Sequence, residues 1–312
     1  MNNKPPKYVL LVFLAILAMT GFGIGQQLYK PKLDTANINA LAIDAQNLGV
    51  SPIPKIIDGS QEPKTKAKNI ILIDADSKHL MYGLGARDKV QIASITKVMT
   101  ALVAYEQKNL DEVVTIEAGD CNVIGSKIGI KAGDRIKTGE LLKALLIKSG
   151  NDTAKALART SAGNEEEFVR LMNEKALSIG LNDTRYMDPH GLSAEAYSTP
   201  FDQAILFSYV LKIDKLKEIM STDKTTIVNE DGIEYELENS NRLITDKLKY
   251  EGAIAGKTGF TFEAGHSLVA AANRNGHTLI SVVLNTFSNT NEASAQETAK
   301  LLDWGFDNFI WE

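Results

Sequence analysis

The chain has 312 residues, of which 44% are hydrophobic and 23% charged, as expected for a globular protein with one large core or two lobes. Its net charge of −5, with acidic and basic residues interspersed, gives no sign of nucleic-acid binding. Cys121 is the only cysteine, which excludes an intrachain disulfide.

The N-terminus has the pattern of an export signal. Lys4 and Lys7 precede an uncharged stretch from Tyr8 to Ile24. A bilayer span needs about 20 apolar residues, and Tyr8 to Leu28 supplies that length. We expect residues 1–29 to be a signal anchor or a signal peptide, and favour the uncleaved anchor because no Ala-x-Ala motif follows the apolar run. Either form places the rest of the protein outside the cytoplasm, attached to the cell membrane or secreted.

A linker is predicted next. Six of the eight prolines lie at or before Pro63. Residues 30–68 are therefore expected to form a polar, turn-rich linker or stalk. The folded domain is expected to cover residues 69–312.

Strand patterns stand at both ends of that domain, with helical patterns between them. Asn69–Asp74 and His79–Gly83 are predicted to form a hairpin, and Ser267–Ala272 and Leu279–Leu284 a second one around the turn Asn273–Gly276. Predicted helices are the apolar Ile95–Ala104, most of Leu141–Leu211, and the amphipathic Ala293–Phe309. The fold class is therefore α/β or α+β, with an antiparallel sheet flanked by helices and an inserted, mainly helical lobe.

Three short motifs could together activate a serine without histidine. They are Ser94-Ile95-Thr96-Lys97, Ser149-Gly150-Asn151 and Lys257-Thr258-Gly259, in that order. A serine hydroxyl needs a base, and a lysine serves if desolvation or a second cation lowers its pKa. Ser94 and Lys97 are three residues apart, which places both side chains on one face of a helix.

Two further copies of these motifs lack that context. Ser221-Thr222-Asp223-Lys224 lies in a polar stretch, and Lys137-Thr138-Gly139 precedes a helical pattern. Lys257-Thr258-Gly259 instead precedes two strand-like runs, where a lysine and a threonine on an edge strand can bind a carboxylate.

From about Asn69 to the C-terminus the chain resembles the low-molecular-mass penicillin-binding proteins that are serine-type D-alanyl-D-alanine carboxypeptidases. The similar stretches are Ala93–Glu106, Gly125–Ala158, Phe168–Leu192 and Gly256–Leu284. The resemblance implies a β-lactamase/transpeptidase-like fold with the active site between the sheet and the helical lobe. Many relatives continue into a C-terminal β-rich domain, and we expect none here.

The resemblance also implies roles for single residues. Ser94 would be the nucleophile, Lys97 the general base, and Ser149 a proton relay to the leaving amine. Asn151 would hold the substrate backbone or orient the lysine. Lys257 and Thr258 would bind the terminal carboxylate of the substrate, and Gly259 would let its backbone approach the strand. The oxyanion hole would consist of the backbone N–H groups of Ser94 and Phe260.

The implied reaction removes the last D-alanine from peptidoglycan stem pentapeptides through an acyl-serine intermediate. β-Lactams would be trapped as covalent inhibitors, and neither a cofactor nor a metal is expected. The alternatives are a D,D-endopeptidase of the same family, a β-lactamase and a non-catalytic β-lactam sensor. A class A β-lactamase needs a deacylating glutamate, and Tyr186–Leu192, where it would lie, has none.

One departure from the family pattern concerns the carboxylate. Many relatives carry an arginine before the Leu-Ile pair of the second hairpin strand, at the position that corresponds to Thr278 here. Carboxylate binding is then expected to depend on Lys257 and Thr258 alone, or on Arg242 from another segment.

Overall fold

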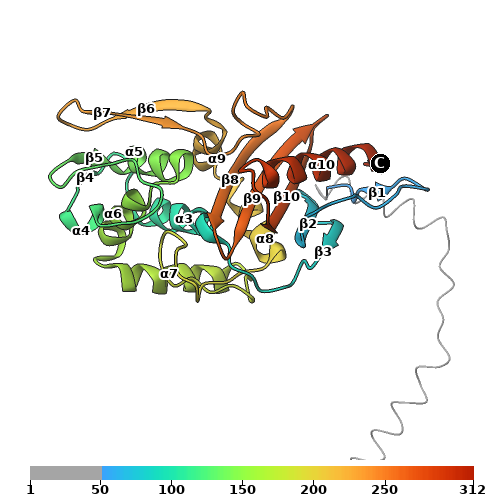
Figure 1. The fold of residues 1–312 in the computed structure, drawn as a ribbon, viewed down its shortest axis with the longest axis horizontal. Coiled ribbons are helices and arrows are strands. Elements are labelled where there is room, and N and C mark those ends of the chain that lie inside the picture. Colours follow the sequence, from blue (N-terminus) through green and yellow to red (C-terminus); the bar gives the residue numbers. More distant parts are fainter. Residues whose placement is uncertain (1–50) are drawn as a thin grey trace, which may run out of the picture. The chain divides into compact units, whose positions relative to one another are not determined.

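A computed structural model describes residues 51–312 of the chain, and Pro52–Glu312 form one compact unit. The centre of this unit is a five-stranded antiparallel sheet in the order β3-β2-β10-β9-β8. The strands are β2 (Asn69–Asp74), β3 (Leu80–Leu84), β8 (Ala253–Thr261), β9 (Gly265–Arg274) and β10 (His277–Thr286). Strands from both ends of the domain share this sheet (Figure 1), which confirms the prediction.

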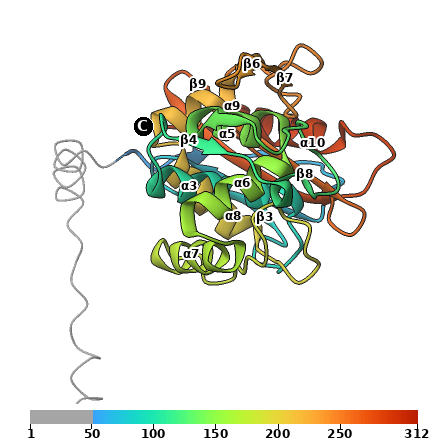
Figure 2. The same ribbon diagram turned by 90° about the vertical axis from the view of Figure 1, so that its left-hand side faces the viewer.

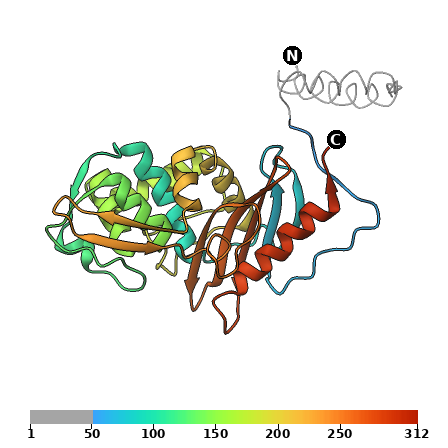
Figure 3. The same cartoon turned by 90° about the horizontal axis from the view of Figure 1, so that it is seen from above.

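Successive side chains of β2 pack into two different cores. Ile71 and Ile73 join a core with α3 (Lys97–Gln107), whereas Ile70 and Leu72 join a second core with α10 (Ala293–Asn308). Figure 3 shows α10 along one face of the sheet and the helical lobe beyond the other. Burial on both faces explains why the β2 sequence is a continuous apolar run rather than an alternating one.

The hairpin of β9 and β10 has the turn that the sequence predicted. Asn275 and Gly276 both have positive φ, at 53° and 85°. A two-residue hairpin loop of this kind matches the twist of the strands, and Asn-Gly is its preferred sequence. The turn fixes the register of β10 on β9.

The chain between β3 and β8 supplies most of the helices. They are a 3-10 helix η2 (Ala93–Thr96), α3, α4 (Ala118–Cys121), α5 (Thr138–Lys143), the π-helix η3 (Ala144–Lys148), α6 (Asn151–Ala162), α7 (Glu165–Ser178), α8 (Pro200–Val210) and α9 (Asp214–Ser221). Two hairpins accompany them: β4 (Val113–Thr115) with β5 (Arg135–Lys137), and β6 (Lys224–Val228) with β7 (Glu234–Glu238). Figure 2 shows α3 and α6 in the middle, between α7 and the β6–β7 hairpin. The predicted helical middle is confirmed, whereas the β6–β7 hairpin was not predicted.

The N-terminal part of the unit packs against the C-terminal helix. β1 (Lys55–Ile56) pairs antiparallel with β11 (Phe309–Ile310). The Trp304 indole N–H donates a hydrogen bond of 2.6 Å to the carbonyl of Gln61. The compact unit thus begins at Pro52, so the predicted start at Asn69 is too late and residues 52–68 of the predicted linker belong to the folded unit. The sequence did not indicate that residues 52–68 are folded, because they are rich in proline and polar residues and their partners lie at the opposite end of the chain.

Within residues 51–312, no helix is both long and apolar enough to cross a membrane. The predicted signal segment at residues 1–29 lies outside the described residues, as does the first part of the predicted linker.

Candidate active site

Ser94 lies in the tight turn of η2, directly before α3. Ala93 has a φ of 48°, a left-handed conformation that is uncommon for alanine. Its carbonyl lies against Gly191, where an added Cβ would come within 1.9 Å of the Ala93 oxygen. Gly191 itself has a φ of 86°. Glycine at 191 is therefore required both for its own backbone conformation and for the strained turn before Ser94.

The Lys97 ammonium nitrogen is 2.7 Å from the Ser94 hydroxyl oxygen and 2.8 Å from the carbonyl oxygen of His190. The Lys97 side chain is fully buried. Burial, reinforced by the positive charge of Lys257, lowers the pKa of Lys97 well below its usual value. The predicted pair Ser94 and Lys97 is thus in hydrogen-bond contact, with the Lys97 amine in a buried position that disfavours its positive charge.

The Ser149-Gly150-Asn151 segment reaches the site from the junction of η3 and α6. Ser149 has a φ of 66°, which ends the π-helix, and its hydroxyl accepts a hydrogen bond of 2.9 Å from the Lys257 ammonium. Asn151 donates from its side chain to the carbonyl of Ile124 at 2.6 Å. Its side-chain oxygen is buried without a hydrogen-bond partner in the described part of the chain, and is free to accept one from a ligand.

Lys257, Thr258 and Gly259 lie on β8, at one edge of the sheet. Burial lowers the pKa of Lys257 to about 7. The Thr258 hydroxyl is 2.7 Å from the Ser240 hydroxyl, which fixes its orientation. A Cβ on Gly259 would lie 2.8 Å from the carbonyl oxygen of Ile92 and 3.1 Å from the backbone nitrogen of Ser94. Glycine is therefore needed at position 259, where β8 contacts the turn that holds Ser94. The next residue of the strand, Phe260, has a half-exposed side chain.

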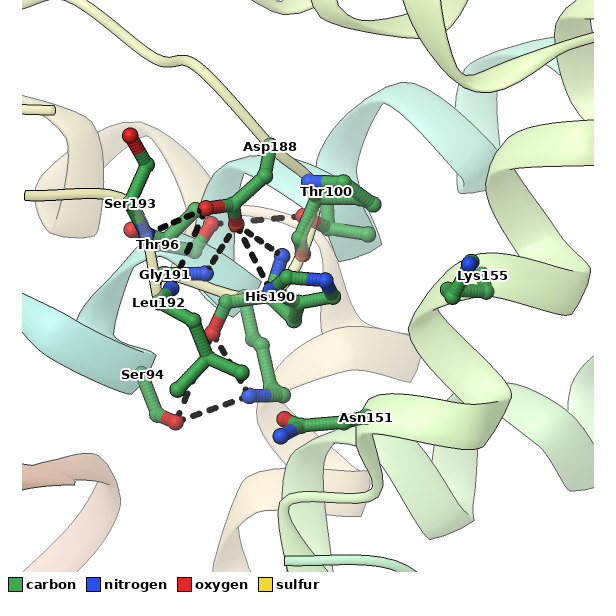
Figure 4. Close-up of polar contacts among 12 residues, drawn as sticks. Ser94, Thr96, Thr100, Asn151, Lys155, Asp188, His190, Gly191, Leu192 and Ser193 are labelled. Atoms are coloured by element: carbon green, nitrogen blue, oxygen red, sulfur yellow. Dashed lines mark hydrogen bonds and ion pairs between the residues drawn. The ribbon is translucent and has the colours of Figure 1, made fainter. Parts of the chain in front are cut away.

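A carboxylate that sequence reasoning did not assign organises the loop opposite β8. Asp188 accepts hydrogen bonds from the backbone N–H groups of four residues, His190 to Ser193 (Figure 4). Its Oδ1 is also 2.9 Å from the His190 Nδ1. Burial would raise the pKa of Asp188, but His190 and the backbone N–H groups together hold it below its usual value. The sequence Asp-Pro-His-Gly was the signal that could have indicated this turn.

The same loop is tied to α3. The Thr100 hydroxyl donates a hydrogen bond of 2.5 Å to the carbonyl of Pro189. The next carbonyl, that of His190, is the one that meets the Lys97 ammonium. His190 thus contacts Lys97 through its backbone oxygen. Asp188 fixes the position of that oxygen because it accepts hydrogen bonds from the backbone of the same loop.

Thr278 does not lie at the site, which corrects one expectation. Thr258 is level with Leu268 on β9 and Val283 on β10, whereas Thr278 pairs with Asn273 near the hairpin turn. Position 278 is therefore too far along β10 to bind a carboxylate near Thr258. Arg242 lines a depression of about 230 Å³ that also includes Ser240, the hydrogen-bond partner of Thr258.

The second copies of the motifs lie outside this cluster. Lys137 ends β5, and its ammonium is 3.7 Å from the Asp111 carboxylate. Ser221 ends α9, where its hydroxyl donates to the carbonyl of Glu218 in its own helix. The structure brings together only the copies that the sequence context favoured.

Comparisons with known proteins agree with this geometry. The D-alanyl-D-alanine carboxypeptidase family model, Peptidase_S11, matches residues 57–288. Over 251 residues the chain is 35% identical to the D-alanyl-D-alanine carboxypeptidase DacF of Bacillus subtilis, a match that covers 78% of this chain and 63% of DacF. Over 265 residues it is 32% identical to a D-alanyl-D-alanine endopeptidase of Pseudomonas aeruginosa, covering 84% of each protein.

A solved structure shows the same fold. The D-alanyl-D-alanine carboxypeptidase of Mycobacterium tuberculosis H37Rv superposes with a TM-score of 0.74 at 30% identity, over 83% of this chain and 96% of that one. The predicted penicillin-binding-protein fold is confirmed. The chain belongs to the D-alanyl-D-alanine carboxypeptidase family of serine peptidases.

Proposed function

We propose that the protein is a serine-type D-Ala-D-Ala carboxypeptidase that removes the terminal D-alanine from peptidoglycan stem pentapeptides. The observation that carries this proposal is the buried Lys97 amine, 2.7 Å from the Ser94 hydroxyl and next to an open strand edge. Family membership supports the reaction class.

Acylation begins when neutral Lys97 accepts the Ser94 hydroxyl proton. The Ser94 oxygen then bonds to the carbonyl carbon between the two D-alanines. Backbone N–H groups of Ser94 and Phe260 stabilise the oxyanion, because donors fixed in advance need no reorganisation during the reaction. The C–N bond breaks as the leaving amine takes a proton, which Ser149 relays from Lys97.

Lys257 and Thr258 hold the terminal carboxylate during this step. A charged Lys257 is costly in a buried position, and a bound carboxylate offsets that cost and favours the protonated form. Water then attacks the ester, with Lys97 again as base, and releases the shortened peptide. β-Lactams would acylate Ser94 through the same contacts and leave a slowly hydrolysed ester.

A D,D-endopeptidase is the second candidate, because one relative at 32% identity carries that name. The two activities share the acyl-serine chemistry and differ in the group on the leaving side of the scissile bond. An endopeptidase must accommodate a cross-linked peptide there in place of the terminal D-alanine.

Product analysis tests the proposal and separates the two activities. Purified protein is incubated with stem pentapeptide and with cross-linked dimer, and is labelled in parallel with fluorescent penicillin. We expect free D-alanine from the pentapeptide and a covalent label on Ser94. Ser94→Ala should fold but neither label nor release D-alanine, whereas Lys137→Ala and Ser221→Ala should behave as the parent protein. Equal labelling of Ser94→Ala would refute the mechanism.

Localisation is proposed on the sequence alone. Residues 1–29 would anchor the protein to the cell membrane with residues 30–312 outside the cytoplasm, next to the wall polymer. Cell fractionation with N-terminal sequencing tests this. A soluble extracytoplasmic protein that begins between Gly21 and Gln27 would show a cleaved signal peptide instead.

A further inference from the structure

A cavity of about 100 Å³ lies beside η2, the turn that holds Ser94, and plays no part in the proposed reaction steps. It lies between the start of η2, the loop after His190 and the end of β8. Its walls include Ala93, Thr96, Gly191, Ser193, Thr261 and Glu263. Figure 4 shows Thr96 next to the Gly191–Ser193 backbone on the side of the loop away from Asn151. We refer to this space as the Thr96–Glu263 cavity.

The chemistry of its walls favours a hydrogen-bond donor with a positive charge. The Thr96 hydroxyl is fully buried and has no hydrogen-bond partner among the described residues. A buried polar group without a partner is rare and indicates that a ligand or water completes the site. Within residues 51–312, Glu263 is the one ionisable side chain that lines the cavity, and no lysine or arginine does. A protonated amine would satisfy the hydroxyl and pair with the carboxylate.

The position of the cavity along β8 indicates which part of a substrate would reach it. An extended peptide can add to the free edge of β8 in antiparallel orientation. With its C-terminal carboxylate at Lys257 and Thr258, its scissile bond meets Ser94 beside Gly259. The acyl part then continues past Phe260 toward Thr261 and Glu263, at about 3.3 Å per residue. The side chain of the residue before D-Ala-D-Ala would thus lie at the cavity.

We infer that the Thr96–Glu263 cavity is a subsite for a protonated amine at the end of the side chain that precedes D-Ala-D-Ala. This inference rests on the proposed carboxypeptidase function. It makes the enzyme selective for stem peptides whose diamino acid is not acylated, and therefore not yet cross-linked through that amine.

Two matched peptides test the subsite. Both end in D-Ala-D-Ala, and the preceding residue is L-lysine in one and Nε-acetyl-lysine in the other. We expect the parent protein to favour the free amine by about tenfold in kcat/KM, the ratio that one charge-assisted hydrogen bond supplies. Glu263→Gln should remove the preference, and Glu263→Lys should reverse it. Glu251→Gln, which changes an exposed carboxylate just before β8, should retain it.

Penicillin labelling of each variant reports independently on folding and on the reactivity of Ser94. Equal rates with both peptides in the parent protein, or an unchanged preference in Glu263→Gln, would overturn the subsite and leave the carboxypeptidase assignment intact. Penicillin labelling without D-alanine release from either peptide would instead refute the proposed function, and the subsite with it.

Discussion

At the scale of single residues, the site depends on two buried lysines whose charges disfavour each other. Lys97 and Lys257 are both fully buried, and the positive charge of Lys257 lowers the pKa of Lys97. Each ammonium still has polar contacts: Lys97 with Ser94 and the His190 carbonyl, Lys257 with Ser149 and the Thr258 carbonyl. Burial thus disfavours the charged form of Lys97, as the proposed base requires, and hydrogen bonds orient the Lys257 side chain.

Replacing Lys97 by arginine tests the base. Arginine keeps the positive charge but cannot become neutral in a protein. We expect Lys97→Arg to lower the rate of penicillin acylation by about 100-fold or more, the usual range for loss of a general base. Stopped-flow acylation measures this, with thermal unfolding as the control for folding. A nearly normal rate would assign the base elsewhere, with Ser149 the next candidate.

The lowered pKa of Lys257 predicts that the stability of the protein depends on pH. This pKa is about 7 in the folded protein against an ordinary value of 10.5. Between these two values the unfolded chain binds more protons, so wild-type stability rises with pH through this range. Lys257→Met removes the titrating group, and we expect its stability relative to wild type to be more favourable at pH 6 than at pH 9. Urea unfolding at both pH values measures the difference. The same difference at both pH values would mean that Lys257 keeps its ordinary pKa.

At the scale of elements, the loop Asp188–Ser193 and strand β8 face each other across the turn that holds Ser94. Glycines make both approaches possible, Gly191 on the loop side and Gly259 on the strand side. The loop contributes the His190 carbonyl, and the strand contributes Lys257 and Thr258. Neither element contains Ser94, yet both contact the turn that holds it.

Asp188 is expected to be a positioning residue for this loop. Asp188→Ala leaves four backbone N–H groups without their acceptor, at about 1–3 kcal/mol for each that stays buried. We expect lower thermal stability and acylation slowed at least about tenfold, because the His190 carbonyl would no longer be held against Lys97. Glu195→Ala, an exposed carboxylate in the same segment, is the matched control and should change neither.

The conservative variant Asp188→Asn distinguishes a positioning role of Asp188 from a general loss of structure. The Asp188 charge raises the pKa of Lys97, in opposition to burial and Lys257. In Asp188→Asn we therefore expect the acidic limb of the acylation pH profile to move to lower pH. A profile that keeps its shape while only the amplitude falls would indicate a purely structural role.

At the scale of the whole molecule, the two ends of the compact unit meet away from the active site. β1 pairs with β11, the Lys66 N–H donates a 2.8 Å hydrogen bond to Glu297, and Ala67 is buried in the core that contains α10. These contacts connect the segment before the sheet to the last helix of the domain.

Truncation tests the boundary. A chain that begins at Asn69 should melt several degrees lower than one that begins at Pro52. A loss of about 1 kcal/mol corresponds to roughly 2–4 °C in a domain of this size. Differential scanning calorimetry makes the comparison. Equal melting temperatures for the starts at Pro52 and Asn69 would show that residues 52–68 contribute nothing to stability.

The sequence by itself determined the features that depend on local spacing. Ser94 and Lys97 are three positions apart, an Asn-Gly pair specifies the β9–β10 turn, and apolar runs mark β2 and α3. Tertiary structure decided what depends on contacts between distant segments. Lys97 contacts a carbonyl 93 residues away, and Lys257 contacts a hydroxyl 108 residues away.

The register of the sheet places Thr278 outside the site, and the pairing of β1 with β11 shows that residues 52–68 belong to the fold. Periodicity reports which face of an element is buried but not which element covers it, and for that reason the Asp188 loop and the Thr96–Glu263 cavity emerged only from the packed structure.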